Sequence, residues 1–204
     1  MTALATDNFN RANAATLGAN WTVLSSPTTH YEVVSNVAAL VGGSLGDDCV
    51  DYYNAVSFPN DQYSQAKLTV TGTGGGGSGV GLCVRKASGS TNTYYRMVAD
   101  HAGSNNVEIG KKVAGAYTNL GNRTSSFTDG ALFYLEVQGT TILAKNAGTT
   151  MGASITDSAI ASGSAGLAYS STETSASSDD WEGGDFAAGG GATVARRLTL
   201  LGVG

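Results

Sequence analysis

Short runs in which apolar and polar residues alternate recur along most of the chain, bounded by Gly, Ser, Asn or Asp. Alternation with a period of two is typical of a half-buried β-strand, whereas a helix repeats its apolar residues every three to four positions. The sequence predicts nine strands, at Tyr31–Val41, Cys49–Val56, Ser64–Thr71, Val80–Lys86, Thr93–Asp100, Asn106–Val113, Leu132–Gln138, Thr141–Lys145 and Ser164–Tyr169. Nine strands suffice for two sheets, and we expect an all-β, two-sheet antiparallel jelly-roll sandwich.

Turn signals separate these runs. Gly139 and Thr140 lie between two strand-like runs, and because Gly readily takes the positive φ of a tight turn, we expect a hairpin there. The Gly-rich stretch 71–79 has no helix after it and no adjoining Lys, so we interpret it as a loop and not as a phosphate-binding loop. The polar run Ser170–Ser178 is also predicted to be a loop.

Alternation also predicts which side chains share a face of a sheet. Val80, Leu82 and Val84 point to one side of their strand, and Tyr95, Met97 and Ala99 to one side of theirs. The other face of these strands carries Asp, Tyr and Arg side chains, and Asp51 and Tyr53 of an earlier strand are expected to add to it. These residue types can stack on sugars and form hydrogen bonds with them. The candidate glycan-binding residues are Asp51, Tyr53, Arg85, Tyr94 and Arg96. The alternative is an ordinary polar, solvent-facing side of an antiparallel sheet.

The C-terminal end is organised differently from the rest. We expect one sandwich domain over residues 1–186, a Gly/Ala linker at 187–192 and an apolar strand at Thr193–Val203. An unpaired apolar strand is an aggregation hazard, so we expect it to dock on another subunit or on a particle. The candidate assembly residues are Val194, Arg196, Arg197, Leu198, Leu200 and Leu201. An internal edge strand of the same sandwich is the alternative.

Composition narrows the range of partners. The net charge of −5 argues against nucleic acid, because such binding depends on Lys and Arg neutralising phosphates. No apolar run is long enough to span a membrane, and residues 1–10 lack the features of a signal peptide. We therefore expect a protein made in a cytoplasm, with Cys49 and Cys83 reduced and half-buried.

Two motifs near the N-terminus, Asp7–Asn13 and Leu17–Thr22, resemble the start of laminin-G-like domains of the concanavalin A-like lectin/glucanase superfamily. Ile155–Asp157, Ala161–Leu167 and Asp179–Trp181 resemble its closing strands, so the likeness covers Asp7 to Phe186. The resemblance implies that the first and last strands are adjacent and that Phe9, Trp21 and Trp181 are largely buried. Domains that open in this way are also frequent in bacteriophage tail and capsid-surface proteins.

The resemblance raises the question of catalysis and of calcium. Enzymes of this superfamily carry alternating carboxylates, but no Glu-x-Asp-x-Glu occurs, and His30 and His101 belong to no nucleophile or zinc motif. Calcium is the only metal that stays a candidate, because the resemblance implies a site where the terminal strands meet a loop, as is often found in this superfamily. Its candidate ligands are Asp7, Asp47, Asp48, Asp179 and Asp180, which as an alternative only cap turns.

Three functional hypotheses follow. The first is a non-enzymatic virion structural or surface protein, part of a capsid or a tail. In this hypothesis it assembles through its terminal strand as a homo-oligomer or with other virion proteins, with cell-surface glycans as a candidate ligand. The second is a free carbohydrate-binding module. The third is a degenerate glycosidase.

Overall fold

The computed structural model describes residues 1–24, 30–41, 48–70, 79–89, 92–100, 106–124, 128–170 and 176–186, and side chains at all of these positions except 48, 49, 100 and 106. Every regular element in these ranges is a β-strand. The strands are β1 (Thr2–Asp7), β2 (Trp21–Val23), β3 (His30–Val34), β4 (Val37–Val41), β5 (Asp48–Tyr53), β6 (Gln62–Val70), β7 (Gly79–Lys86), β8 (Tyr94–Asp100), β9 (Asn106–Val113), β10 (Ala116–Thr124), β11 (Ala131–Gln138), β12 (Thr141–Asn146), β13 (Thr149–Thr150), β14 (Ile155–Thr156), β15 (Ser164–Ser170) and β16 (Ala176–Asp185). None of the described segments is a helix able to span a membrane.

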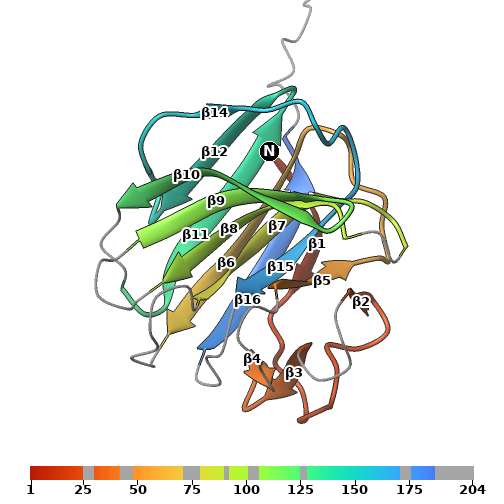
Figure 1. Cartoon of the computed structure of the whole chain (residues 1–204). Helices are drawn as coiled ribbons and strands as arrows, with labels where there is room; N and C mark the ends of the chain where they lie inside the picture. The colour runs from red at the N-terminus through yellow and green to blue at the C-terminus, as the bar shows by residue number, and fades with distance from the viewer. Residues whose placement is uncertain are drawn as a thin grey trace, which may run out of the picture.

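The strands form two antiparallel sheets that lie face to face (Figure 1). Sheet A has the order β13-β12-β11-β6-β16-β4-β3, with β1 paired to β16 and β14 paired to β12. Sheet B has the order β10-β9-β8-β7-β15-β5-β2. This architecture confirms the predicted all-β, two-sheet antiparallel jelly-roll sandwich.

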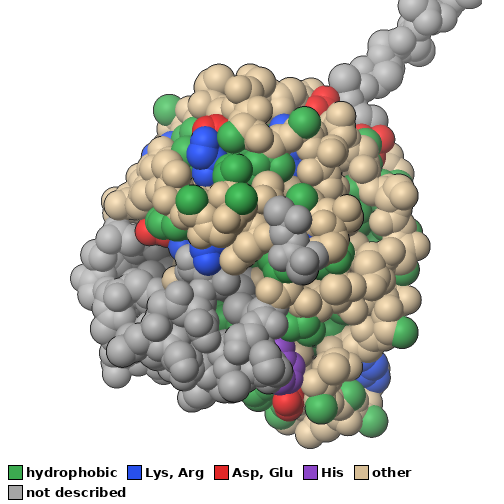
Figure 2. All heavy atoms as spheres, turned by 45° about the vertical axis from the view of Figure 1, so that its right-hand side comes forward, with side chains coloured by type: hydrophobic (Ala, Val, Ile, Leu, Met, Phe, Trp, Pro, Cys, Tyr) green, Lys and Arg blue, Asp and Glu red, His purple; other side chains and the backbone are tan. Residues whose placement is uncertain are grey.

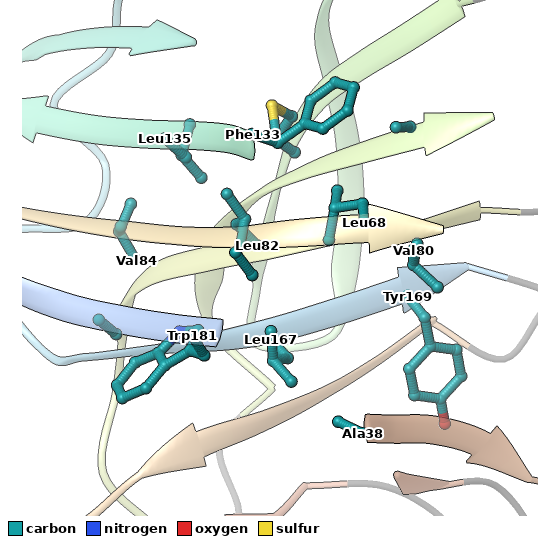
Figure 3. Packing of buried hydrophobic residues seen from close by; sticks show 14 of the residues in the cluster. Ala38, Leu68, Val80, Leu82, Val84, Phe133, Leu135, Leu167, Tyr169 and Trp181 are labelled. Carbon is teal, nitrogen blue, oxygen red and sulfur yellow. The ribbon is translucent and has the colours of Figure 1, made fainter. Parts of the chain in front are cut away.

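The core lies between the sheets, where the alternating apolar residues meet. Figure 3 shows Leu68 and Leu135 of sheet A close to Val80, Leu82 and Leu167 of sheet B. Each of these side chains is fully buried, and each such burial stabilises the fold by about 1.5–3 kcal/mol. The predicted inward faces of β7 and β8 are therefore confirmed.

The two ends of the sandwich domain meet in sheet A. Strand β1 pairs antiparallel with β16, with Asp7 opposite Trp181. Phe9 and Trp181 are fully buried and Trp21 is almost so. The Trp21 ring lies 5.9 Å from Phe9 and 4.7 Å from Trp181, as centroid distances. The adjacency of the terminal strands and the burial of these three aromatic residues are thus confirmed.

Tight turns divide the chain where the sequence places turn residues. Gly139 has a φ of +56° in the predicted β11–β12 hairpin. The predicted long strand Tyr31–Val41 is in fact two strands, because Ser35 and Asn36 both adopt positive φ and form a two-residue turn between β3 and β4. Strand β16 begins at Ala176, inside the run that was predicted to be a loop.

The outer surface carries few charges. On the face shown in Figure 2, charged side chains are scattered among uncharged polar and backbone atoms. Cys83 is a free thiol that is fully buried on β7, deeper than the predicted half-burial. Burial raises the pKa of this thiol well above its usual range.

Candidate functional site

The five predicted glycan-binding residues do not share one face of the molecule. Asp51 and Tyr53 on β5 point between the sheets, because Asp51 is paired with the core residue Leu167 and Tyr53 stacks on Trp181 with ring centroids 5.3 Å apart. Val50, on the opposite side of β5, packs instead in a small outer cluster with Cys83 and Tyr94. The predicted orientation of β5 is therefore inverted, and Asp51 and Tyr53 are not available as an exposed patch.

Arg85 also does not lie on its predicted face, and in this case the cause is an irregularity in β7. Ser164 of β15 pairs with Lys86, but Gly166 pairs with Cys83, so β7 holds one extra residue in a β-bulge. Arg85 lies in this bulge with a φ of +49°, and its guanidinium turns to backbone carbonyls at the end of the sandwich. The bulge breaks the period-two rule on which the prediction relied.

Tyr94 and Arg96 do lie together on the outer face of sheet B, on alternate positions of β8. Tyr94 is fully buried, so it supports the face and offers no contact surface. The Arg96 side chain is 3% exposed and donates from Nη2 to Glu108 Oε1 at 2.9 Å. Arg96 therefore belongs to a cluster that extends onto β9 and β10.

That cluster is centred on Tyr117 of β10, and we call it the Tyr117 platform. It consists of Arg96, Glu108, Tyr117, Asn119 and Asn122, whose pairing registers place them on the outer face of sheet B. They come from β8, β9 and β10, the three strands at the β10 edge of that sheet (Figure 1). Residues directly opposite each other on antiparallel strands share a face, which explains why three strands supply one cluster.

The Tyr117 ring lies against Gly110 of the neighbouring strand β9. A Cβ atom added to Gly110 would meet the Tyr117 ring and hydroxyl at 2.5–2.9 Å, so a larger residue at this position would displace the ring. The Arg96 guanidinium carbon lies 4.7 Å from the ring centroid, within the range of a cation–π contact. Tyr117 nevertheless remains 39% exposed. One side of the ring is thus held by the protein while a large part of it faces solvent.

Hydrogen bonds fix the polar atoms around this ring. Glu108 accepts from the Tyr117 hydroxyl, from Arg96 and, at 3.2 Å, from the Asn119 side-chain amide. Asn119 also donates to Asn122 Oδ1 at 2.9 Å. Partial burial and the bond to Glu108 raise the pKa of Tyr117 to about 12, although Arg96 opposes this. The phenol therefore stays protonated at ordinary pH, and the uncharged ring is surrounded by amide groups and the Arg96–Glu108 ion pair.

Sequence reasoning missed β10, and with it Tyr117. The strand is mostly exposed and polar, so it has no alternation of apolar residues. A usable signal was present in Ala114-Gly115, where both residues adopt positive φ in the turn from β9. A two-residue turn ending in Gly after a predicted strand favours a hairpin, and would have predicted a partner strand at β10.

The described residues do not fit the predicted calcium site. Each oxygen of the Asp7 carboxylate already accepts two donors, from the Phe9 amide, the Trp21 indole and the Arg11 guanidinium. Asp180 lines the same 390 Å³ pocket as Asp7 but is ion-paired with Lys67 at 2.6 Å. Within the described part of the chain, no three His, Cys, Asp or Glu residues are grouped so that they could hold a metal ion.

The remaining candidates have other positions. Asp179 is next to Asp180 in β16, where the pairing with β6 is irregular, and it accepts a hydrogen bond from the Asp180 backbone amide at 2.8 Å. The side chain of Asp48 and all of Asp47 are outside the described residues. The predicted assembly residues, Val194, Arg196, Arg197, Leu198, Leu200 and Leu201, also lie outside them.

Comparisons with known proteins support the fold. No family model and no curated protein matches the sequence. Among solved structures, a Bacillus subtilis protein of unknown function with a galectin-like fold matches with a TM-score of 0.68 and 8% identity, over 91% of this chain and 96% of that one. The carbohydrate-binding module CBM66 from Bacillus subtilis matches with a TM-score of 0.56 and 16% identity, over 83% and 95%.

A third similar structure is the exoplasmic/lumenal domain of VIP36 in its Ca²⁺- and Man3GlcNAc-bound form. It matches with a TM-score of 0.57 and 12% identity, over 80% of this chain and 83% of that one. At such low identities these likenesses establish the jelly-roll sandwich fold, and a shared fold does not by itself imply a shared function.

Proposed function

We propose that this chain is a non-enzymatic carbohydrate-binding protein that stacks a sugar ring on Tyr117. The observation that carries the proposal is the flat, partly exposed Tyr117 ring edged by Glu108, Asn119 and Asn122. The C–H face of a pyranose is apolar and its rim is made of hydroxyls, so it is complementary to an aromatic ring surrounded by hydrogen-bonding groups.

The platform is also preorganised. Arg96 and Gly110 contact the ring, and Glu108 accepts a hydrogen bond from its hydroxyl. A side chain that is already fixed loses little conformational entropy when it binds, so more of the contact energy appears as affinity. Two of the structurally similar proteins are described as a carbohydrate-binding module and as a mannoside-bound form, which is consistent with the same class of ligand here.

The platform supports binding better than catalysis. Glycoside hydrolysis generally needs two carboxyl groups on opposite sides of the scissile bond. Glu108 is the single carboxylate in the platform, and it already accepts three hydrogen bonds. A group engaged in this way is suited to orienting its neighbours.

The test compares polysaccharide binding by matched variants. Affinity electrophoresis through gels containing plant, bacterial and yeast polysaccharides, together with a glycan array, should give retention by the native chain on at least one glycan. Tyr117→Ala should weaken that binding about tenfold or more, and Tyr117→Phe should keep most of it because the ring remains. Leu132→Ala, a residue with 38% exposure on sheet A, is the matched control and should bind normally. Equal binding by native protein and Tyr117→Ala would contradict the proposal.

The laminin-G-like family, the virion location and assembly through Thr193–Val203 remain predictions from the sequence. If the chain is a virion surface protein, glycan binding by the platform would serve attachment to a cell. Deletion of Ala192–Gly204 tests the assembly prediction. Docking predicts a folded domain with unchanged melting that no longer oligomerises or joins its particle. A truncated protein that melts much lower while its assembly is intact would contradict it.

A further inference from the structure

A second hollow lies away from the Tyr117 platform, at the end of the sandwich where β6 begins and β7 ends. It has a volume of about 290 Å³, and its lining includes Asn60, Asp61, Arg85, Thr140, Ser158 and Ala161. These residues come from four separate segments, including the β11–β12 turn and the segment before β15. Pockets for small ligands typically have volumes from about 300 Å³ upward, so this one suits a ligand of one ring.

Arg85 forms hydrogen bonds to the three other segments that line the pocket. Its guanidinium donates to the carbonyls of Asn60, Gly139 and Ile160, each at 2.8 Å. The backbone amide of Arg85 adds a bond to Gln62 Oε1 at 3.0 Å. A residue held at a φ of +49° costs conformational energy, which these bonds offset. The shape of the pocket is therefore fixed before any ligand arrives.

A second set of bonds holds the remaining wall. Asp157 accepts from Tyr95 at 2.6 Å and from Lys111 at 2.5 Å, and its amide donates to the Thr140 carbonyl at 2.9 Å. The Tyr95 hydroxyl in turn accepts the amide of Ile160 at 3.0 Å. The segment that carries Ser158 and Ala161 is thus braced against β8 and β9.

Among the described residues, the lining of the pocket carries one positive and one negative side chain. The Arg85 side chain is 4% exposed, and its Nη2 lies 3.6 Å from Asp61 Oδ1. Asp61 stands at the rim with 41% of its side chain exposed, and its Oδ1 also accepts the Gly139 amide at 2.7 Å. One cation and one carboxylate leave no net charge to attract an ion, so the electrostatics favour an uncharged polar ligand.

The available groups match a polyol. Arg85 lines the pocket, and its Nη1 donates to the Ile160 carbonyl, which belongs to another lining residue. Thr140 and Ser158 supply hydroxyls, Asp61 supplies a carboxylate oxygen at the rim, and Ala161 supplies apolar contact. Adjacent hydroxyls of a sugar both donate and accept, and such a mixed set can satisfy both functions.

We propose that this pocket is a second binding site, for a single uncharged sugar ring or a similar polyol. The site is independent of the Tyr117 platform, because it lies at the end of the sandwich and shares none of its residues. It would let the protein hold a chain end or a side branch of a glycan in addition to a stacked ring. With only one ring held, a Kd in the millimolar range is expected.

The test uses ¹⁵N-labelled full-length protein titrated with D-glucose, D-mannose, D-galactose, D-fructose and glycerol. At least one probe should shift the amide signals of Gly139 and Ile160 in a saturable way. Ala161→Trp fills the pocket from an exposed position and should abolish these shifts, and Thr140→Val should weaken binding several-fold. Ala153→Trp makes the same change on an exposed loop residue outside the pocket and should leave the titration unchanged.

Two results would overturn the proposal. One is that no probe perturbs Gly139 and Ile160; the other is that shifts persist unchanged in a folded Ala161→Trp protein. Failure of the platform is a separate result, because that site is measured by the dependence of polysaccharide retention on Tyr117.

Discussion

The Asp7 carboxylate accepts the indole N–H of Trp21 at 2.8 Å. The same carboxylate also accepts two hydrogen bonds from the Arg11 guanidinium and one from the Phe9 backbone amide. Asp7 ends β1, and Trp21 begins β2 in the other sheet, so this bond ties the N-terminal strand of sheet A to sheet B beside the buried Trp181. Asp7 thereby stabilises the region where the ends of the sandwich meet.

Asp7→Ala should destabilise the protein by about 2–3 kcal/mol, because it leaves the buried indole N–H and the Phe9 amide without an acceptor. Asp7→Asn should lose less, since an amide oxygen can still accept one of them. Urea unfolding followed by Trp fluorescence measures the change. Lys67→Ala, which removes the exposed ion pair with Asp180, is the control and should have no measurable effect. A neutral Asp7→Ala result would show that the bond network contributes nothing to stability.

Calcium should not stabilise the protein through Asp7. Both oxygens of this carboxylate are already occupied by protein donors, and a cation would have to displace Arg11. The melting temperature in millimolar calcium should therefore lie within about 1 °C of its value in EDTA. A rise of several degrees that Asp7→Asn abolishes would show that calcium replaces the Arg11 contact.

Strands with strong alternation could be predicted from the sequence, and features set by distant contacts could not. Val80, Leu82 and Val84 have no polar residue competing for the core, so their orientation follows from the pattern. Asp51 is buried because the Tyr31 amide, 20 residues away, donates to it at 3.1 Å, and nothing local indicates that bond. The bulge at Arg85 depends likewise on carbonyls from three other segments.

In the candidate site, too, one residue could be predicted from local alternation and another could not. Arg96 was identified from its strand, because β8 alternates clearly. Tyr117 was missed because an exposed edge strand needs no apolar residues, so a single sequence gives it no hydrophobic signal. Its proposed role depends on contacts of its ring with Gly110 and Arg96, which lie on two other strands.

Arg85→Lys should destabilise the protein by about 3–5 kcal/mol, because a lysine cannot reach three separate carbonyls and leaves buried acceptors unpaired. Thermal unfolding of the variant measures this. Arg123→Lys is the matched control, since Arg123 bonds two carbonyls in an exposed setting and should tolerate the change. Similar small losses in both variants would show that the Arg85 clamp is not a major source of stability.

Asp51 gives the fold a pH dependence of its own. The residue is fully buried on the inner side of β5, and Oδ1 has no hydrogen-bond partner among the described residues. Burial raises the pKa of Asp51 from 3.8 to about 7, although the bond from the Tyr31 amide opposes this. Cys83 is the one other titratable side chain whose pKa responds to Asp51 among the described groups with a resolved shift.

Because the folded state raises this pKa, it holds a proton that the unfolded chain has already released. The stabilisation is fully present below pH 3.8, falls as the pH rises towards about 7, and is lost above that. The difference between the two pKa values corresponds to a change on the order of 4 kcal/mol. Asp51→Asn mimics the neutral form, so it should match the native protein near pH 4 and be more stable by up to this amount at pH 8. Urea unfolding of both proteins across this range measures the difference, in which all other titrating groups cancel. A difference that does not change with pH would mean that Asp51 stays ionised in the folded protein.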